Sequence, residues 1–236
     1  MKTILLTGGS RGIGRAIVEH AVKKNYFVIF TYNKNKKISL NLHKKYPDKT
    51  LPIKVNLSLE KDRKKLFNIL KKKKFKLDCL INNAAFDVKR KKIENISIKE
   101  LKAIYEVNVF AVYDLIKNSI KLMRQKKNWK SIINISSTAA KFGGKFYTHH
   151  APTKSAIENL TIGLSRELSD KKIRVVCVAP GVIDSKIENR KNIQVIKSIP
   201  NARLGKSEEV AKLIIWLSSD DAEYINGTTI TIAGGR

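Results

Sequence analysis

The stretch Thr3-Ile4-Leu5-Leu6-Thr7-Gly8-Gly9-Ser10-Arg11-Gly12-Ile13-Gly14 decides the fold of this chain. It begins apolar and β-branched, as a buried strand does, and a helical pattern over 12–24 follows the glycines directly. Glycines at such a junction let the backbone turn sharply and approach a ligand closely. The amino end of the helix then faces that ligand and favours a phosphate. The stretch therefore predicts a strand–turn–helix unit that binds the pyrophosphate of a dinucleotide.

Strand and helix patterns alternate through the rest of the chain. Apolar, β-branched runs predict strands at 3–7, 27–31, 51–55, 77–82, 131–136, 173–179 and 228–232. Helical periodicity predicts helices near 12–24, 60–73, 97–127, 153–169 and 208–218. Such apolar strands with helices between them indicate a parallel sheet that is covered on both faces. We therefore predict an α/β fold, a single Rossmann-type doubly wound domain over 1–236 with a seven-stranded parallel sheet, whose ligand lies beyond the carboxyl ends of the strands.

The composition excludes several classes of protein. The 48 lysines and arginines against 20 acidic residues give a net charge of +28, but 38 of these cations are lysine and only 10 are arginine. Sequence-specific nucleic-acid binders rely on the arginine fork, so this balance indicates solubility and general attraction to anions rather than nucleic-acid binding. No apolar run approaches the roughly 20 residues of a membrane span, and 42% hydrophobic content argues against disorder. Cys79 and Cys177 lie in apolar stretches, which predicts a reduced, cytoplasmic protein, and no metal site is predicted.

The end of the second predicted strand indicates which dinucleotide binds. Sites for NAD usually present an Asp or Glu there, which holds the 2′-hydroxyl of the ribose. Here the strand continues into Thr31-Tyr32-Asn33-Lys34 without a carboxylate. Arg11 and Lys34 are placed to meet a 2′-phosphate instead; the alternative is that both are ordinary surface cations. The sequence favours NADP(H) over NAD(H).

Several motifs together resemble the short-chain dehydrogenase/reductase family over nearly the whole chain. The glycine loop has the family's TGxxxGIG pattern, Asn82-Asn83-Ala84-Ala85 is similar to its NNAG motif, and 200–210 and 227–235 resemble its carboxyl-terminal signature. Within the family, 136–184 is similar to bacterial 3-oxoacyl-carrier-protein reductases and sugar dehydrogenases, and also to divergent enoyl-carrier reductases. The resemblance implies hydride transfer from a nicotinamide to a carbonyl carbon or to an enoyl β-carbon.

The resemblance also implies which residues bind and react. Asn108 matches the family's catalytic asparagine, which would hold a water in a proton relay, and Ser137 matches the serine that stabilises the developing oxyanion. Lys154 matches the lysine that positions the nicotinamide ribose. The expected cofactor contacts are Gly8, Ser10, Arg11, Gly12, Ile13, Gly14, Tyr32, Asn33, Lys34, Asn56, Leu57, Asn83, Ala84, Ala85, Lys154, Pro180, Gly181, Val182 and Ile183.

The chain departs from the family at the proton donor. The family carries YxxxK, which places tyrosine and lysine on one helix face, but here His150 stands four residues before Lys154. A neutral imidazole is a weaker acid than a phenol, and the charge of Lys154 disfavours the imidazolium form. Tyr147 is the other candidate, because it shares this face if the helix starts early, and its spacing to Lys154 resembles that of the divergent enoyl-carrier reductases. The alternative is that Tyr147 is only an aromatic residue of the pocket wall.

Three functions follow as hypotheses. The first is an NADP(H)-dependent reductase of a carbonyl compound or an enoyl thioester, with Tyr147 or His150 as the acid. The second is a cofactor-binding protein with little redox activity, and the presence of Asn108, Ser137 and Lys154 argues against it. The third is a nucleic-acid or membrane-surface binder that uses the basic face.

The segment 184–206 corresponds to the element that covers the substrate in the family. It mixes apolar residues at helical spacing with cations, which suits an acyl group on an acidic carrier; an ordinary amphipathic lid over a small-molecule substrate is the alternative. The resemblance further implies a homotetramer or a homodimer.

Overall fold

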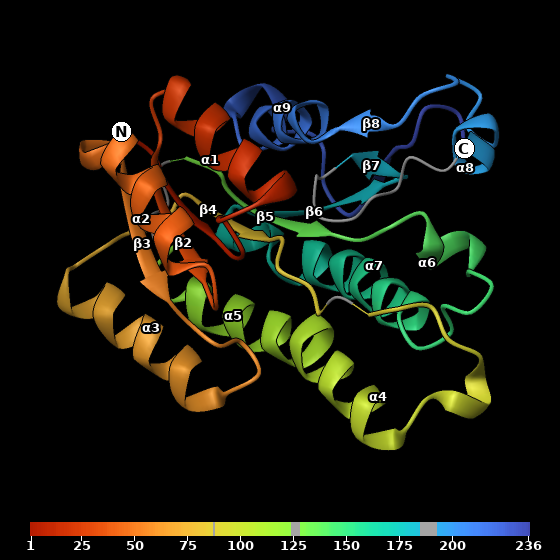
Figure 1. The fold of residues 1–236 in the computed structure, drawn as a ribbon. Helices are drawn as coiled ribbons and strands as arrows, with labels where there is room; N and C mark the ends of the chain where they lie inside the picture. The colour runs from red at the N-terminus through yellow and green to blue at the C-terminus, as the bar shows by residue number, and fades with distance from the viewer. Residues whose placement is uncertain (87, 124–127, 185–192) are drawn as a thin grey trace.

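The computed structural model describes residues 1–86, 88–123, 128–184 and 193–236 (Figure 1). At its centre lies a seven-stranded parallel sheet in the order β3-β2-β1-β4-β5-β6-β9. Its strands are β1 (Thr3–Leu6), β2 (Phe27–Tyr32), β3 (Thr50–Lys54), β4 (Cys79–Asn82), β5 (Lys130–Ile135), β6 (Ile173–Pro180) and β9 (Thr229–Ile232). The predicted seven-stranded parallel sheet is confirmed, and every predicted strand ends within two residues of the observed one.

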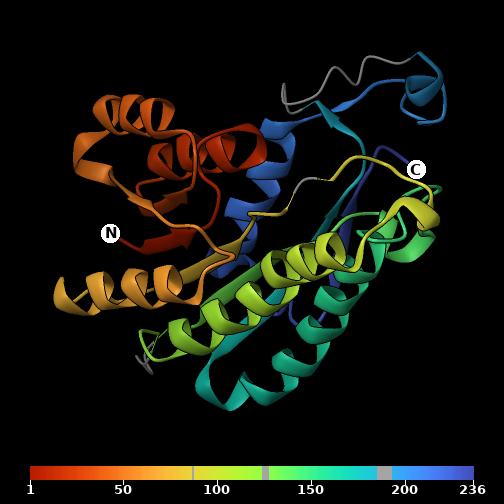
Figure 2. The ribbon, with the colours of Figure 1, turned by 60° about the horizontal axis from the view of Figure 1, so that its bottom comes forward.

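Helices cover both faces of this sheet, as Figures 1 and 2 show. One face carries α1 (Gly12–Lys23), α2 (Lys36–Lys45) and α9 (Ser207–Leu217), and the other carries α3 (Glu60–Lys72), α4 (Ile98–Tyr105), α5 (Ala111–Ile120) and α7 (Ala151–Glu167). Successive strand residues pack into opposite layers: Ile4 and Leu6 join the first hydrophobic cluster, and Leu5 joins the second. Burial on both faces explains why the strands read as continuous apolar runs.

The long helix predicted at 97–127 is interrupted at its middle. α4 continues into a π-helical turn over Glu106–Phe110 and then into α5, which ends at Ile120, while 124–127 lie outside the described residues. A π turn adds one residue to the helical repeat and often occurs at a functional site. Asn108 lies at the centre of this turn. The sequence periodicity gave no sign of this insertion, because the apolar spacing is nearly the same on both sides of it.

Several short elements were not predicted. α2 buries only Ser39 and Leu42, which is too few residues for a clear apolar period. Four shorter elements, each of five residues or fewer, were also not predicted. They are the helices α6 (Ala139–Phe142) and α8 (Ile193–Lys197) and the paired strands β7 (Ile183–Asp184) and β8 (Gly205–Lys206). Within the predicted covering segment 184–206, residues 185–192 lie outside the described part of the chain. None of the helices that the structure describes is long and apolar enough to cross a membrane.

A buried arginine joins α3 to the interrupted helix. The side chain of Arg63 is 7% exposed; its Nε donates to Asp114 on α5 at 2.8 Å, and its Nη1 donates to Glu106 in the π turn at 2.8 Å. Nη1 also donates to the carbonyl oxygen of Leu57 at 2.5 Å, in the loop after β3. Burial alone would lower the pKa of Arg63, but the hydrogen bonds and charges of both carboxylates outweigh it and raise this pKa. One side chain therefore holds three segments together.

Replacing Arg63 should measurably destabilise the protein. We expect Arg63→Ala to lower the free energy of unfolding by about 2–3 kcal/mol, somewhat less than for a fully buried ion pair, because water reaches both carboxylates. The matched control is Lys64→Ala on the same helix, whose ion pair with Glu60 is exposed and should contribute almost nothing. Urea unfolding followed by circular dichroism gives both values. Equal losses in the two variants would contradict this account of Arg63.

Candidate active site

A cavity of about 570 Å³ opens at the carboxyl ends of the central strands. Its lining includes residues that follow β2, such as Lys34, and residues that follow β5, such as Ser137. Because β1 and β4 lie between β2 and β5 in the sheet, the cavity crosses the point where the strand order reverses. Ligands of doubly wound sheets bind at this position.

The cavity gathers most of the residues that the sequence singled out. Four predicted catalytic residues line it, namely Ser137, Tyr147, His150 and Lys154. The predicted cofactor contacts that line it are Gly8, Ser10, Arg11, Ile13, Gly14, Tyr32, Asn33, Lys34, Asn56, Leu57, Asn83, Ala84, Ala85, Lys154, Pro180, Gly181 and Ile183.

Three predicted residues are not part of this lining, and several others are. Gly12 and Asn108 lie outside the lining, and Val182 lines a separate pocket of about 130 Å³ beside β7 and β8. The lining residues that sequence reasoning missed include Thr31, Asn35, Val55, Ser58, Phe86, Val107, Ile135 and Ser136. Most of them directly flank predicted residues at the same strand ends, so widening each motif by a few residues would have found them.

The residues after β4 hold the glycine loop in place. Thr7 Oγ1 accepts hydrogen bonds from the backbone N–H of Asn83 at 3.0 Å and of Ala84 at 2.9 Å. The Asn83 side chain donates in turn to the carbonyl oxygens of Thr7 at 2.9 Å and Gly8 at 3.1 Å. A Cβ on Gly14 would lie 2.0 Å from the Gly8 carbonyl oxygen, so only glycine fits there. The first turn of α1 carries no acidic residue, which leaves its amino end suited to a phosphate.

The charge of the cavity is positive. Arg11, Lys34 and Lys154 line it, whereas none of the described lining residues is an aspartate or a glutamate. The Nζ atom of Lys154 donates to the carbonyl oxygen of Ile135 at 2.9 Å, and burial lowers the pKa of this lysine to about 8. Such a lining fits a ligand that carries several negative charges, as a dinucleotide phosphate does.

The turn before α7 places the two candidate proton donors side by side. The N–H of Ala151 donates to the Tyr147 carbonyl oxygen at 3.0 Å, which is the bond of a helical turn, so helical geometry already begins at Tyr147. Tyr147, His150 and Lys154 therefore share one face of the helix. The rings of Tyr147 and His150 stack, with centroids 4.5 Å apart and planes inclined by 26°. The neighbouring His149 is buried, and its Nε2 lies 3.2 Å from the carbonyl oxygen of Lys89.

Asn108 lies behind the wall of the cavity. Its side chain accepts from the N–H of Phe86 at 2.8 Å and donates to Thr153 Oγ1 at 3.1 Å. Thr153 Oγ1 donates to the carbonyl oxygen of His150 at 2.7 Å. In this arrangement Asn108 holds the segment after β4 against the start of α7, and with it the backbone of His150.

The two serines after β5 have different partners. Ser137 Oγ accepts from the N–H of Ala139 at 3.2 Å, which leaves its hydroxyl hydrogen to be donated into the cavity. Ser136 Oγ instead donates to Glu158 Oε1 at 2.7 Å. Of the two serines, Ser137 is thus the one whose hydroxyl can donate to a ligand in the cavity, and its role as the oxyanion donor stays a prediction.

Known proteins are similar to this chain along its whole length. The family model described as Enoyl-(Acyl carrier protein) reductase matches residues 8–236. The uncharacterized oxidoreductase YgfF of Escherichia coli is 33% identical and covers 100% of both chains. The 3-oxoacyl-[acyl-carrier-protein] reductase FabG of Haemophilus influenzae is 32% identical over 99% of this chain and 97% of its own. Among solved structures, the short-chain dehydrogenase/reductase of Brucella melitensis titled glucose/ribitol dehydrogenase superposes with a TM-score of 0.90 at 28% identity, over 99% of this chain and 96% of that one.

The lowered pKa of Lys154 predicts how stability depends on pH. The folded protein loses this proton near pH 8 and the unfolded chain near its ordinary pKa of 10.5, so between these values the unfolded chain binds more protons. Folding stability from this group therefore rises with pH across that window. Lys154→Met removes this pH dependence. We compare the free energy of unfolding of the variant with that of the parent protein at each pH. The difference, variant minus parent, should be about 3 kcal/mol larger below pH 8 than above pH 10.5. Urea unfolding over this range measures the difference, with Lys145→Met, at an exposed lysine, as the matched control. A constant difference for Lys154→Met would contradict the prediction.

Proposed function

Because this chain belongs to the short-chain dehydrogenase/reductase family of oxidoreductases, we propose that it is an NADP(H)-dependent reductase of a carbonyl substrate. The observation that carries this proposal is the cavity itself, whose described lining contains no carboxylate and in which the glycine loop meets the group of Ser137, Tyr147 and Lys154. The cofactor would place its pyrophosphate at the amino end of α1, and Lys154 would hold the nicotinamide ribose.

The choice of NADP(H) rests on the cavity wall after β2. Arg11 and Lys34 both line this part of the cavity, and the run 31–35 contains no carboxylate that would repel a 2′-phosphate. Asn35 donates to Ser10 Oγ at 3.4 Å, which links the end of β2 to the glycine loop between the two cations. A phosphate bound here would receive charge-assisted hydrogen bonds from two sides.

The residues at the other end of the cavity would stabilise and protonate the product. When bound, a reduced nicotinamide supplies a hydride to the carbonyl carbon. Ser137 donates a hydrogen bond to the carbonyl oxygen as negative charge develops on it. Tyr147 then gives its phenolic proton to that oxygen. An imidazolium at His150 would add a fourth positive charge to the cavity, and a neutral imidazole is a weaker acid than a phenol, so we assign the proton to Tyr147.

Reduction of an enoyl thioester is a second candidate. The family model that matches the chain is described as Enoyl-(Acyl carrier protein) reductase. In addition, the tyrosine of this chain stands at position 147, and position 150 holds a histidine. A phenol one turn further from Lys154 would suit a substrate whose hydride acceptor, the β-carbon, is separated from its oxygen by two more carbon atoms. A small-molecule carbonyl and a carrier-borne acyl group are therefore both substrates to assay.

We also propose that the protein is a cytoplasmic homo-oligomer. Phe110 of the π turn, Tyr113 of α5 and Ile162 of α7 are 56%, 59% and 39% exposed, and a second copy packed on these helices would cover them. Cys79 and Cys177 are buried free thiols whose pKa burial raises to about 12, which suits a compartment that keeps cysteines reduced.

Substitutions at the stacked rings test the proton donor. Tyr147→Phe should lower kcat/KM by about 100-fold or more with little change in NADPH affinity, because it removes only the transferred proton. His150→Phe keeps a stacked ring and should cost less than about 10-fold, and His150→Tyr restores the family's spacing as a matched gain-of-donor variant. NADPH oxidation with 3-oxobutyryl and crotonyl thioesters and with simple ketones measures the effect. Loss in His150→Phe alone would assign the acid to His150, and no turnover with any substrate would favour the cofactor-binding protein without redox activity.

Substitutions at the two cavity cations test the cofactor. Arg11→Ala and Lys34→Ala should each raise the Kd for NADPH by about 10-fold and leave the weaker Kd for NADH nearly unchanged, because only NADPH carries the 2′-phosphate. Fluorescence titration of each cofactor gives these constants. Lys36→Ala, an exposed cation at the start of α2 outside the cavity lining, is the control. Equal weakening of NADPH and NADH would contradict the assignment of these cations to the phosphate.

A further inference from the structure

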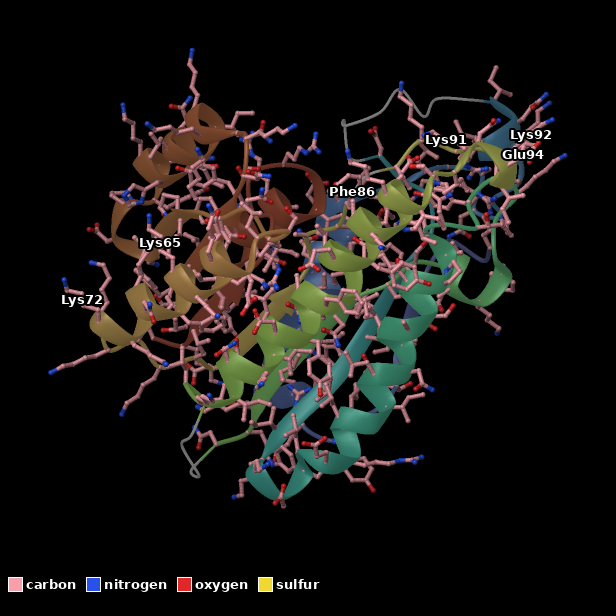
Figure 3. All side chains as sticks on the ribbon, turned by 90° about the horizontal axis from the view of Figure 1, so that it is seen from below. Lys65, Lys72, Phe86, Lys91, Lys92 and Glu94 are labelled. Atoms are coloured by element: carbon pink, nitrogen blue, oxygen red, sulfur yellow. The ribbon has the colours of Figure 1, made fainter. Side chains whose placement is uncertain are left out.

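A cation stands directly outside the wall that Tyr147 forms. The Cζ atom of Arg90 lies 5.5 Å from the centroid of the Tyr147 ring, and the arginine is exposed and not part of the cavity lining. Arg90 belongs to the segment that follows β4. In Figure 3 this segment passes from Phe86, near the middle of the molecule, to Lys91, Lys92 and Glu94 at its outer edge.

The backbone on both sides of Arg90 is tied to the segment that carries Tyr147. The N–H of Lys91 donates to the carbonyl oxygen of Phe146 at 2.9 Å, and the carbonyl oxygen of Lys89 lies 3.2 Å from Nε2 of the buried His149. The Tyr147 ring is itself stacked on His150 and meets His149 edge-on, with centroids 5.8 Å apart. These contacts hold the backbone beside Arg90 against the segment of Tyr147, and its guanidinium lies over a ring that other contacts keep in place. A backbone placed in this way reduces the entropy lost when a ligand binds.

Two described carboxylates near Arg90, one in this segment and one in α4, are already bound by neighbouring lysines. Glu100 is bound by Lys91 through both carboxylate oxygens, at 2.8 and 2.9 Å, and Glu94 lies 3.8 Å from Lys92. Within the ranges that the structure describes, no carboxylate forms an ion pair with Arg90. A guanidinium over a ring still has N–H groups to donate, and their fork matches the two oxygens of a carboxylate or phosphate.

We propose that Arg90 determines specificity by binding an oxyanion of the substrate, so that the preferred substrates are carbonyl compounds that carry a carboxylate or a phosphate. The inference rests on the proposed function, which places the carbonyl oxygen at Ser137 and Tyr147. The reacting carbonyl then lies on the cavity side of Tyr147, and the anionic group reaches past the ring to Arg90. The three cations of the lining bind the cofactor, and Arg90 recognises the substrate.

Matched pairs of anionic and neutral carbonyl compounds test this role. Acetoacetate is compared with methyl acetoacetate for the carboxylate, and dihydroxyacetone phosphate with dihydroxyacetone for the phosphate. Calorimetric titration of the NADP⁺-loaded protein gives the Kd of each compound, and NADPH oxidation gives KM and kcat. The variants are Arg90→Gln, which removes the charge, Arg90→Lys, which keeps it, and Lys92→Gln, which removes a charge of the same segment that lies beside Glu94.

Arg90→Gln should raise the Kd and KM of the anionic member of one pair by about 10-fold, leave its neutral partner within about 2-fold, and leave kcat nearly unchanged. Arg90→Lys should recover part of the loss, and Lys92→Gln should resemble the parent protein. The pair that responds tells whether the substrate carries a carboxylate or a phosphate. A fall in kcat for both members would mean that Arg90 acts through Tyr147, and absence of Arg90-dependent binding for both pairs would likewise overturn the inference. If only the neutral ketones are reduced, the proposed reductase function still holds and the role of Arg90 does not. If the anionic compounds bind through Arg90 but nothing is reduced, the role of Arg90 is supported and the reductase function is contradicted.

Discussion

The hydrogen bonds between Thr7 and the residues after β4 are the contacts on which the site depends. β1 and β4 are neighbours in the sheet, but the chain leaves β1 for α1 on one face and leaves β4 toward α4 on the other. The two loops therefore diverge at the point where a ligand binds. The Thr7 hydroxyl accepts from two backbone N–H groups, and the Asn83 amide satisfies two carbonyl oxygens. Residues 76 positions apart in the chain thus share their polar groups, and these bonds join the two loops beside the cavity.

The strands were predictable because each is buried on both faces. Ile4, Leu5 and Leu6 alternate between two hydrophobic layers, so the sequence shows one uninterrupted apolar run at each strand. Helices were predictable where an apolar stripe meets the sheet, as in α1 and α9. Elements held by other interactions were not predictable from apolar periodicity. α2 buries two side chains only, and Arg63 joins α3 to the π turn by charge.

The motif positions of the candidate site were predictable, but the relations between them were not. The family resemblance named Ser137, but it did not show that Ser136 donates to Glu158 while Ser137 accepts from the N–H of Ala139. The stacking of Tyr147 on His150 depends on where helical geometry begins, and the bond from Ala151 to Tyr147 was not readable from the residues. Asn108 lies behind the wall, because the π turn rotates it toward Phe86 and Thr153. Arg90 was missed because nothing in the sequence distinguishes it from the other cations.

The placement of the acidic residues determines which parts of this protein, with its net charge of +28, are left to bind anions. With 48 cations and 20 acidic residues, carboxylates are the scarce partners, and the fold directs them to particular sites. Arg63 forms ion pairs with Asp114 and Glu106, and Lys91 forms one with Glu100. The described lining of the cavity, by contrast, contains no acidic residue. An excess of flexible lysines attracts every anion to a similar degree, so charge alone cannot select a substrate. Selection requires a cation at a defined point, and the Arg90 guanidinium over the Tyr147 ring would provide one.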